Sequence, residues 1–313
     1  MNVLTKTMRV TKFDIYRIFV VILLFCSVTD GFGQGQITRP SKSNSHNKPP
    51  KRTQTQQSDN QNQHYLDSIA NLPREEEYIN NLLVRWSPDV TNEQKTAITT
   101  IVNNLIDIEG GTFIMGSDKH DHYWEYAGKR YYIDEPTHSE RVNSFKLSKY
   151  ELTQKIWETI MGNNPSRYWG DDFPVTNVSW NDCQSFINKI QQLSDIEFRL
   201  PTEVEWEYVA RKNLPKYSEY LPYIRKTEWV SYNTDKMPHS VGTKECNSFG
   251  VYDIIGNVSE WTSDHASLDY NHPRTLKNYI ARGNAYNSWS PEYMRYDFNA
   301  YDKKDSLGFR VAL

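Results

Sequence analysis

The sequence predicts an α+β fold in which regular secondary structure is sparse. Between residues 91 and 211, short helical patterns alternate with short strand patterns. After residue 212 the sequence offers only short strands, turns and many aromatic rings. The chain has 21 Tyr, 12 Phe and 9 Trp among 313 residues. Because tyrosine and tryptophan rings pack in a core while their polar ends form hydrogen bonds, this composition suits an irregular but well-packed domain.

The overall composition excludes several classes of protein. The formal net charge is −3 at pH 7, which excludes a strongly basic nucleic-acid-binding protein. With 14 Gly and 3 Cys, the chain is neither collagen-like nor a disulfide scaffold. It has one long apolar run, so it is not a membrane protein with several spans.

Residues 1–33 resemble a cleaved secretory signal. Basic residues precede an apolar run over residues 18–28, which is too short to span a bilayer comfortably, and Gly31-Phe32-Gly33 follows it. The alternative is an N-terminal anchor helix. Lipid attachment at Cys26 is a further alternative, although Phe25 stands where a bacterial lipoprotein signal has a small residue. We therefore expect export across the inner membrane to the periplasm or cell surface, with membrane contact only through an anchor or a lipid on Cys26.

Residues 34–65 are expected to form a disordered basic linker. The segment carries five basic residues against a single acid, Asp59, and is otherwise mostly Gln, Asn, Ser and Pro. Such a segment cannot bury enough apolar surface to offset the entropy lost on ordering. The remainder of the chain is acidic, which argues against nucleic-acid binding and suits bound cations.

The folded part opens with a helical lead-in over residues 66–107 and continues with strands. Within the lead-in, Thr91 and Gln94 have the spacing of a capping box. The segment from Gly110 to Gly116 predicts a turn and a short strand. The alternation over residues 142–147 predicts another strand.

Three further helices are expected, each opened by a serine or threonine that caps its first turn. They cover residues 153–161, 179–193 and 202–211. In the second of them, Phe186, Ile187 and Ile190 recur at helical spacing and should face the core. Thr202 and Glu205 repeat the capping-box pattern.

Seven motifs occur in order along residues 108–313. They are IEGGTFIMGS (108–117), FKLSKYELTQKIWETIMG (145–162), PVTNVSWNDCQSF (174–186), FRLPTEVEWEYVAR (198–211), NSFGVYDIIGNVSEWTSD (247–264), ARGNAYNS (281–288) and GFRVAL (308–313). Together they resemble the formylglycine-generating enzyme family, also called the sulfatase-modifying-factor domain. The resemblance covers about residues 106–313, and we place the domain at residues 108–313. It implies a C-type-lectin-like α+β fold with little regular secondary structure.

The resemblance also implies a chemistry that this chain lacks the residues to perform. Active members oxidise a cysteine in a Cys-x-Pro-x-Arg segment of a sulfatase to formylglycine, using oxygen and a copper(I) ion held by two cysteines. Their cysteine positions correspond here to Ser288 and Tyr293. Because copper(I) prefers soft thiolate ligands, copper is not expected. The cysteines of the domain, Cys183 and Cys246, are expected either as a disulfide or as two buried free thiols.

One structural calcium ion is expected from the same resemblance. Its ligands correspond to the side chains of Asp253 and Glu260 and the backbone carbonyls of Gly256 and Val258. Calcium takes six to eight oxygen ligands from carboxylates, carbonyls and water, so the residue types fit. The alternative is that Asp253 and Glu260 only cap turns.

A second branch of this fold uses non-haem iron, held largely by histidines from an additional helical domain. Residues 66–107 are far too short to form that domain. Asp118, His120 and His122 form a separate His-rich stretch. Its spacing suits either a transition-metal site on one strand face or a solvated loop.

These observations predict an exported, non-catalytic family member that binds a protein or glycan ligand of the cell envelope. The enzyme cleft would then persist as a binding groove, since exposed aromatic and arginine side chains are typical of binding surfaces. The expected groove residues are Trp180, Arg282, Trp289, Arg295 and Tyr296.

Two alternatives remain. The first is a formylglycine-generating oxidase, or another family enzyme, with a non-standard site that acts on sulfatase-type peptides. The second is a variable ligand-binding protein on the same lectin-like fold. In such proteins a C-terminal surface segment is rich in Asn, Tyr, Ser and Asp, as residues 284–302 are. An ordinary irregular loop explains that composition equally well.

Overall fold

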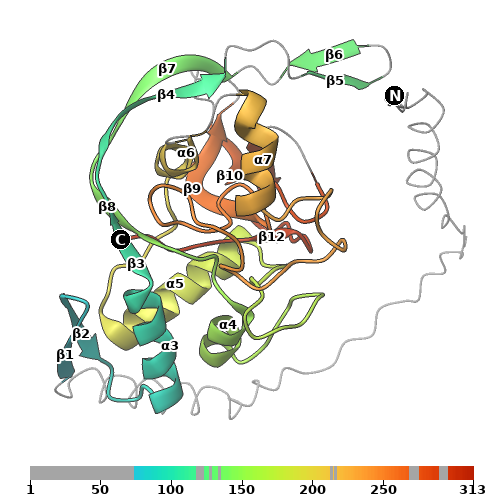
Figure 1. The fold of residues 1–313 in the computed structure, drawn as a ribbon. Helices are drawn as coiled ribbons and strands as arrows, with labels where there is room; N and C mark the ends of the chain where they lie inside the picture. Colours follow the sequence, from blue (N-terminus) through green and yellow to red (C-terminus); the bar gives the residue numbers. More distant parts are fainter. Residues whose placement is uncertain are drawn as a thin grey trace, which may run out of the picture. The chain divides into compact units, whose positions relative to one another are not determined.

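Short strands and helices alternate along the computed structural model, which describes residues 74–117, 123–126, 129–132, 135–211, 214, 217–267, 275–288 and 295–313 (Figure 1). Residues 228–258 contain no helix or strand. The α+β class with little regular secondary structure is therefore confirmed. The expected signal and linker segments lie outside the described residues. Within the described residues, no helix is both long and apolar enough to cross a membrane.

The segment expected as a helical lead-in contains a hairpin followed by a helix. Strands β1 (Glu75–Ile79) and β2 (Leu82–Trp86) pair antiparallel, and α3 (Asn92–Asn103) follows. Asn80 and Asn81 have φ angles of 48° and 64°, and such left-handed turn residues join strands that twist correctly for a hairpin. The prediction was thus wrong for the hairpin. It was right for α3, where Thr91 and Gln94 form the expected capping box.

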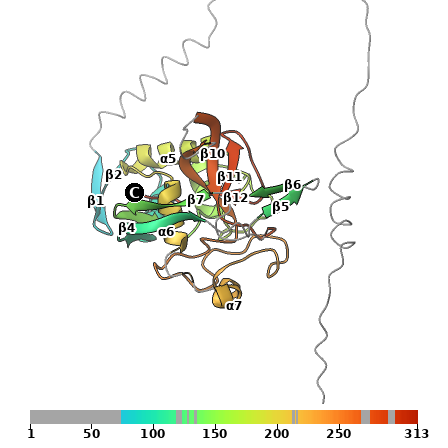
Figure 2. The same cartoon turned by 90° about the horizontal axis from the view of Figure 1, so that it is seen from above.

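Six strands of the first half, β3 to β8, form three small antiparallel pairs. Strand β3 (Leu105–Ile108) pairs with β8 (Phe145–Ser148), β4 (Gly111–Ser117) with β7 (Glu135–Val142), and β5 (Tyr123–Tyr126) with β6 (Lys129–Tyr132). The predicted strand over residues 142–147 is therefore two strands. Gly110 packs against the break between them, where an added Cβ would lie 2.4 Å from the Val142 carbonyl oxygen. The β1–β2 and β5–β6 hairpins lie on opposite sides of the described part (Figure 2).

The three predicted helices are confirmed as α4 (Gln154–Met161), α5 (Trp180–Ser194) and α6 (Glu203–Arg211). Thr153 and Ser179 cap α4 and α5, and the Thr202 hydroxyl accepts a hydrogen bond from the Glu205 amide at 3.1 Å. A further helix, α7 (Tyr217–Thr227), was not predicted. It contains Pro222, a residue that normally argues against a helix interior.

The C-terminal part forms a four-stranded sheet in the order β11 (Arg295–Asn299), β10 (Thr275–Arg282), β9 (Ser259–Ser267) and β12 (Leu307–Gly308). Strand β12 runs parallel to β9, and the other neighbours are antiparallel. Helix α6 lies against β9 and β10. Trp261 of β9 belongs to one apolar core cluster and Trp206 of α6 to another, so the sheet and α6 join the two clusters.

Candidate functional site

A small cavity at one end of the four-stranded sheet contains two of the residues singled out by the sequence, Ser288 and Tyr296. We call it the site pocket. Its volume is about 160 Å³, and it is lined by Ser259, Asn287, Ser288, Tyr296, Phe298, Lys304, Ser306 and Leu307. The Ser288 hydroxyl accepts a hydrogen bond from the Ala285 amide at 3.0 Å, and the Ser288 carbonyl accepts one from the Ser231 amide at 3.2 Å. These two contacts fix Ser288 in the wall of the pocket.

The loop that follows α4 contacts the segments that carry the pocket residues. The Asn177 amide donates to the Lys304 carbonyl at 2.9 Å, and Arg167 forms an ion pair with Asp305 at 3.0 Å. The Tyr168 ring meets the Tyr286 ring edge to face, with 5.8 Å between centroids. Burial, together with the nearby Tyr168 and Asp305, raises the pKa of Tyr286 to about 12. The loop is therefore held against residues 286–305 by charge, backbone and ring contacts.

A row of partly exposed rings crosses one face of the sheet beside the site pocket. Tyr279 of β10 stands opposite His265 of β9 and Phe298 of β11 in the strand register. The Trp180 ring stacks on Tyr279 with 3.8 Å between centroids. The Tyr296 and Phe298 rings stack at 5.9 Å. We call these five residues the aromatic strip; none of them is fully buried.

The structure corrects the prediction that Arg282 lines the groove. Its side chain is fully buried and forms ion pairs with Glu203 and Glu207, which α6 presents to the sheet. Arg295 forms hydrogen bonds with Glu203 at 2.6 and 3.0 Å, and its side chain is 18% exposed. Both arginines therefore join α6 to β10 and β11, because two buried carboxylates need compensating charge.

The remaining predicted groove residues divide between the aromatic strip and segments that the structure does not describe. Trp180, on the first turn of α5, donates a hydrogen bond from its indole nitrogen to the Thr262 carbonyl at 3.0 Å. Trp289 and Tyr293 lie outside the described residues, as do Asp118, His120 and His122. Of the residues that the sequence did not single out, Tyr279 and Phe298 extend the strip, and Lys304 completes the pocket. The alternation of Tyr296 and Phe298 was the available signal for the strip.

Three predicted calcium ligands, Asp253, Gly256 and Val258, lie in a buried turn before β9, and the fourth, Glu260, lies on β9 itself. One Asp253 carboxylate oxygen, Oδ2, accepts a hydrogen bond from the Gly242 amide at 2.7 Å, and Oδ1 is buried without a hydrogen-bond partner. Among the described residues, no hydrogen bond ends on the carbonyl oxygen of Gly256 or Val258. The Glu260 carboxylate, in contrast, accepts hydrogen bonds from Arg310 at 2.7–2.9 Å and from Trp206 at 3.0 Å. Three of the four predicted ligands thus keep an oxygen available for a cation.

The charge around this turn favours an additional cation. Four buried carboxylates, which we call the carboxylate cluster, share this region: Glu151, Glu228, Asp253 and Glu260. The positive groups that act on them are the buried Arg310 and the partly buried Lys244. Burial raises the pKa of Asp253 to about 6, and burial with repulsion from Asp253 raises the pKa of Glu151 and of Glu228. Ionised, the cluster exceeds its two cations by two charges, which is the charge of one calcium ion.

The carboxylate cluster does not converge on a single point. Within the described ranges, no group of three or more His, Cys, Asp or Glu side chains could hold a metal ion. A calcium ion here would therefore depend on backbone carbonyls and on water for most of its oxygens, as calcium sites often do. The residues fit such an ion, and calcium stays a prediction.

Both described cysteines are free thiols. Cys183 is buried on α5, and burial raises its pKa well above the usual value. Cys246 is exposed and precedes a turn in which the Gly250 amide donates to the Asn247 carbonyl at 2.9 Å. The disulfide alternative is therefore wrong. The buried-thiol alternative is right for Cys183 and wrong for Cys246. Neither cysteine lines the site pocket.

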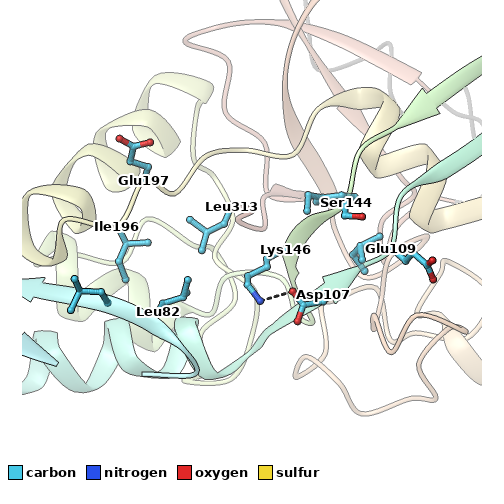
Figure 3. Close-up of a pocket in the computed structure, with 11 residues that line it drawn as sticks. Leu82, Asp107, Glu109, Ser144, Lys146, Ile196, Glu197 and Leu313 are labelled. Carbon is cyan, nitrogen blue, oxygen red and sulfur yellow. Dashed lines mark hydrogen bonds and ion pairs between the residues drawn. The ribbon is translucent and has the colours of Figure 1, made fainter. Parts of the chain in front are cut away.

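A larger cavity lies between the β1–β2 hairpin and the C-terminus, away from the predicted site residues (Figure 3). Its volume is about 700 Å³, and Leu82, Ile196 and Leu313 give it an apolar lining. Lys146 and Asp107, which also line it, form an ion pair at 2.5 Å. None of the predicted site residues lines this cavity, so we do not assign the functional site to it.

A family model described as the sulfatase-modifying factor enzyme 1-like domain matches residues 90–313, and so includes α3. Among curated relatives, "Chaperone protein LppX" of Paenibacillus barcinonensis is 26% identical, over 58% of this chain and 76% of its own length. The "Formylglycine-generating enzyme" of Thermomonospora curvata is 31% identical, over 54% of this chain and 74% of its own. The "Inactive C-alpha-formylglycine-generating enzyme 2" of Bos taurus is 31% identical, over 45% of this chain and 50% of its own.

Two solved structures share the fold. "Treponema denticola variable protein 1" superposes with a TM-score of 0.55 at 20% identity, covering 76% of this chain and 98% of its own. PvdO from Pseudomonas aeruginosa superposes with a TM-score of 0.55 at 24% identity, covering 66% of this chain and 93% of its own. At these identities the likeness establishes the fold and carries no function.

Proposed function

The chain belongs to the family of the sulfatase-modifying factor enzyme 1-like domain, and from that premise we propose that it is a non-catalytic member that binds a polypeptide partner in the cell envelope. The observation that carries the proposal is the chemistry of the site pocket. The resemblance assigns the first copper-binding cysteine to Ser288, which lines the pocket. A hydroxyl does not replace a thiolate as a copper(I) ligand.

The aromatic strip supplies a surface suited to binding. Its rings are partly exposed, and stacking on one another limits the rotamer freedom that they would lose when a partner covers them. Aromatic side chains of this kind contribute strongly at the centres of interfaces. The ion pairs of Arg282 and Arg295 to α6 hold β10 and β11 in place beneath the strip. The surface is therefore set before a partner arrives.

The names of two relatives agree with a role outside catalysis. One is named a chaperone, and another is named an inactive enzyme. A polypeptide partner is also the class on which the formylglycine-generating enzymes of this family act. Placement in the envelope rests on the predicted signal over residues 1–33 and is tested by sequencing the mature N-terminus. A new N-terminus just after residue 33 would support export with signal cleavage. A blocked N-terminus at Cys26 would instead show a lipid-anchored form.

A turnover assay tests the non-catalytic part of the proposal. The purified chain is incubated with copper, oxygen, a reductant and a Cys-x-Pro-x-Arg peptide, and the peptide is analysed by mass spectrometry. We expect no formylglycine above background. The Thermomonospora curvata enzyme, assayed in parallel, serves as the positive control. Formylglycine made by this chain would establish an oxidase with a different ligand set.

Crosslinking to envelope extracts tests the binding part. We expect a crosslinked species that Phe298→Ala weakens strongly and Tyr301→Ala leaves unchanged, because Tyr301 is 78% exposed on the turn after β11 and lies outside the strip. Protease treatment of the extract should abolish the species. If glycosidases abolish it and proteases do not, the partner is a glycan and the polypeptide assignment is wrong.

A further inference from the structure

The site pocket holds a cation that faces no described anion. The Lys304 ammonium group lies 4.7 Å from the centroid of the Phe298 ring, on which it packs as a cation–π pair. The neighbouring lysine, Lys303, instead forms an ion pair with Asp182 at 2.8 Å. Within the part of the chain that the structure describes, no carboxylate lies within ion-pair distance of Lys304, and none lines the pocket.

The pocket lining includes other residues that carry hydrogen-bond donors. The Ser288 oxygen already accepts from the Ala285 amide, so the hydroxyl hydrogen of Ser288 is left to donate elsewhere. Asn287, Ser306 and Tyr296 add further side-chain donors to the lining. Asp305, the nearest acid along the chain, is turned to Arg167 at 3.0 Å. The pocket therefore combines one cation with several donors and, among its lining residues, no carboxylate.

From this arrangement we propose that the site pocket binds an oxyanion, either a carboxylate or a phosphate group, with Lys304 as its main charge partner. The volume of about 160 Å³ suits one such group rather than a whole ligand. The inference deepens the proposed function and rests on it for the source of the anion. A polypeptide lying along the aromatic strip would place an acidic side chain, a C-terminal carboxylate or a phosphorylated residue into the pocket.

Titration of the full chain with acetate and with inorganic phosphate, at constant ionic strength, tests the proposal. Binding is followed by NMR through the backbone amides of Asn287, Ser288 and Ser306. We expect saturable shifts of these amides in the millimolar range. Stronger binding of acetate would identify a carboxylate as the natural group, and stronger binding of phosphate a phosphate.

Two lysine variants separate a site from general attraction. Lys304→Gln removes the charge and should weaken binding about tenfold or more, as expected for a hydrogen bond to a charged group. Lys303→Gln, the matched control next to it, should bind as the parent does, because its charge is already used by Asp182. The proposal would be overturned if both variants lost the same affinity for the anion, or if Lys304→Gln bound it as tightly as the parent does.

The outcome also separates this inference from the proposed function. The absence of saturable shifts with either anion would overturn the oxyanion site, even if crosslinking through the strip succeeds. If Lys304-dependent binding persists while crosslinking fails, the anion site stands and the polypeptide-binding role falls. Retained amide dispersion in each variant shows that the fold is intact.

Discussion

At the residue scale, Arg310 joins Glu260 of the carboxylate cluster to three backbone carbonyls. Its guanidinium donates to Glu260 at 2.7–2.9 Å and to the backbone carbonyls of Ser148, Lys149 and Tyr252 at 2.9–3.1 Å. Both partners of the ion pair are fully buried. The single side chain therefore joins β8, the turn at residue 252 and β9.

Replacing Arg310 with methionine is expected to destabilise the protein by about 3–5 kcal/mol, the cost of leaving a buried charge without its partner. Urea unfolding followed by circular dichroism measures the change. Lys155→Met is the control, because Lys155 and Asp171 form a largely exposed pair at 3.8 Å. It should change the free energy of unfolding by less than about 1 kcal/mol. If the two variants lose similar amounts of unfolding free energy, Arg310 does not compensate a buried charge.

Tyr286 should make the protein sensitive to alkaline pH. Its pKa is raised to about 12, mainly by burial, whereas an unfolded tyrosine titrates near 10. The stability that the protonated Tyr286 contributes is present in full below about pH 10. It is lost as the pH rises towards about 12. The free energy of unfolding, measured in urea between about pH 9 and about pH 11, should therefore fall less steeply in Tyr286→Phe than in the parent. Tyr301→Phe, on an exposed turn, should keep the parent slope; identical slopes in all three proteins would contradict the assignment.

At the element scale, the caps explain why four helices begin where the sequence places them. Ser179 opens α5 with a full capping box, in which Asp182 accepts a hydrogen bond from the Ser179 amide at 2.8 Å. Ser179→Ala should cost about 1 kcal/mol, and Ser179→Asn much less. Thermal and urea unfolding measure both variants. Ser185→Ala, in the middle of the same helix, is the matched control. An equal effect at positions 179 and 185 would show that the cap does not define the start of α5.

Local signals account for the helices that were predicted, whereas the aromatic strip depends on pairing between distant strands. Caps and helical spacing lie within a few residues, so α3 to α6 could be placed from the sequence. The strip depends on Tyr279, Phe298 and His265 meeting across three strands, which no local pattern encodes. The β1–β2 hairpin was missed although Asn80-Asn81 is a turn signal, because the capping box downstream favoured a helix.

At the scale of the whole molecule, the candidate site was only partly predictable. The order of the motifs placed Ser288 and Tyr296, and both line the site pocket. Arg282 was assigned to the groove because arginine is common at interfaces, yet its partners Glu203 and Glu207 lie on a helix far away in sequence. The burial of those carboxylates follows from the packing of α6 on the sheet, which the local sequence does not encode. Lys304 belongs to none of the motifs. It becomes a candidate site residue only because the fold places aromatic rings and hydroxyl groups next to it.

The last prediction is that calcium binding at the turn before β9 stabilises the whole domain. If calcium neutralises the carboxylate cluster at Asp253, the chelated chain should melt at a lower temperature than the calcium-loaded chain. A free calcium concentration about 100 times the dissociation constant adds about 2.7 kcal/mol to the free energy of unfolding. For a domain of this size that is a rise of about 5–10 °C in Tm, measured by calorimetry.

Asp253→Asn should abolish the calcium-dependent rise, whereas Asp195→Asn, at the exposed end of α5, should preserve it. Magnesium, which demands near-octahedral geometry, should substitute poorly in a turn that offers carbonyl oxygens. An unchanged Tm in millimolar calcium would mean that Arg310, Lys244 and bound protons compensate the cluster without calcium. Asp253 would then serve the fold through its hydrogen bond to the Gly242 amide, which is the turn-capping alternative.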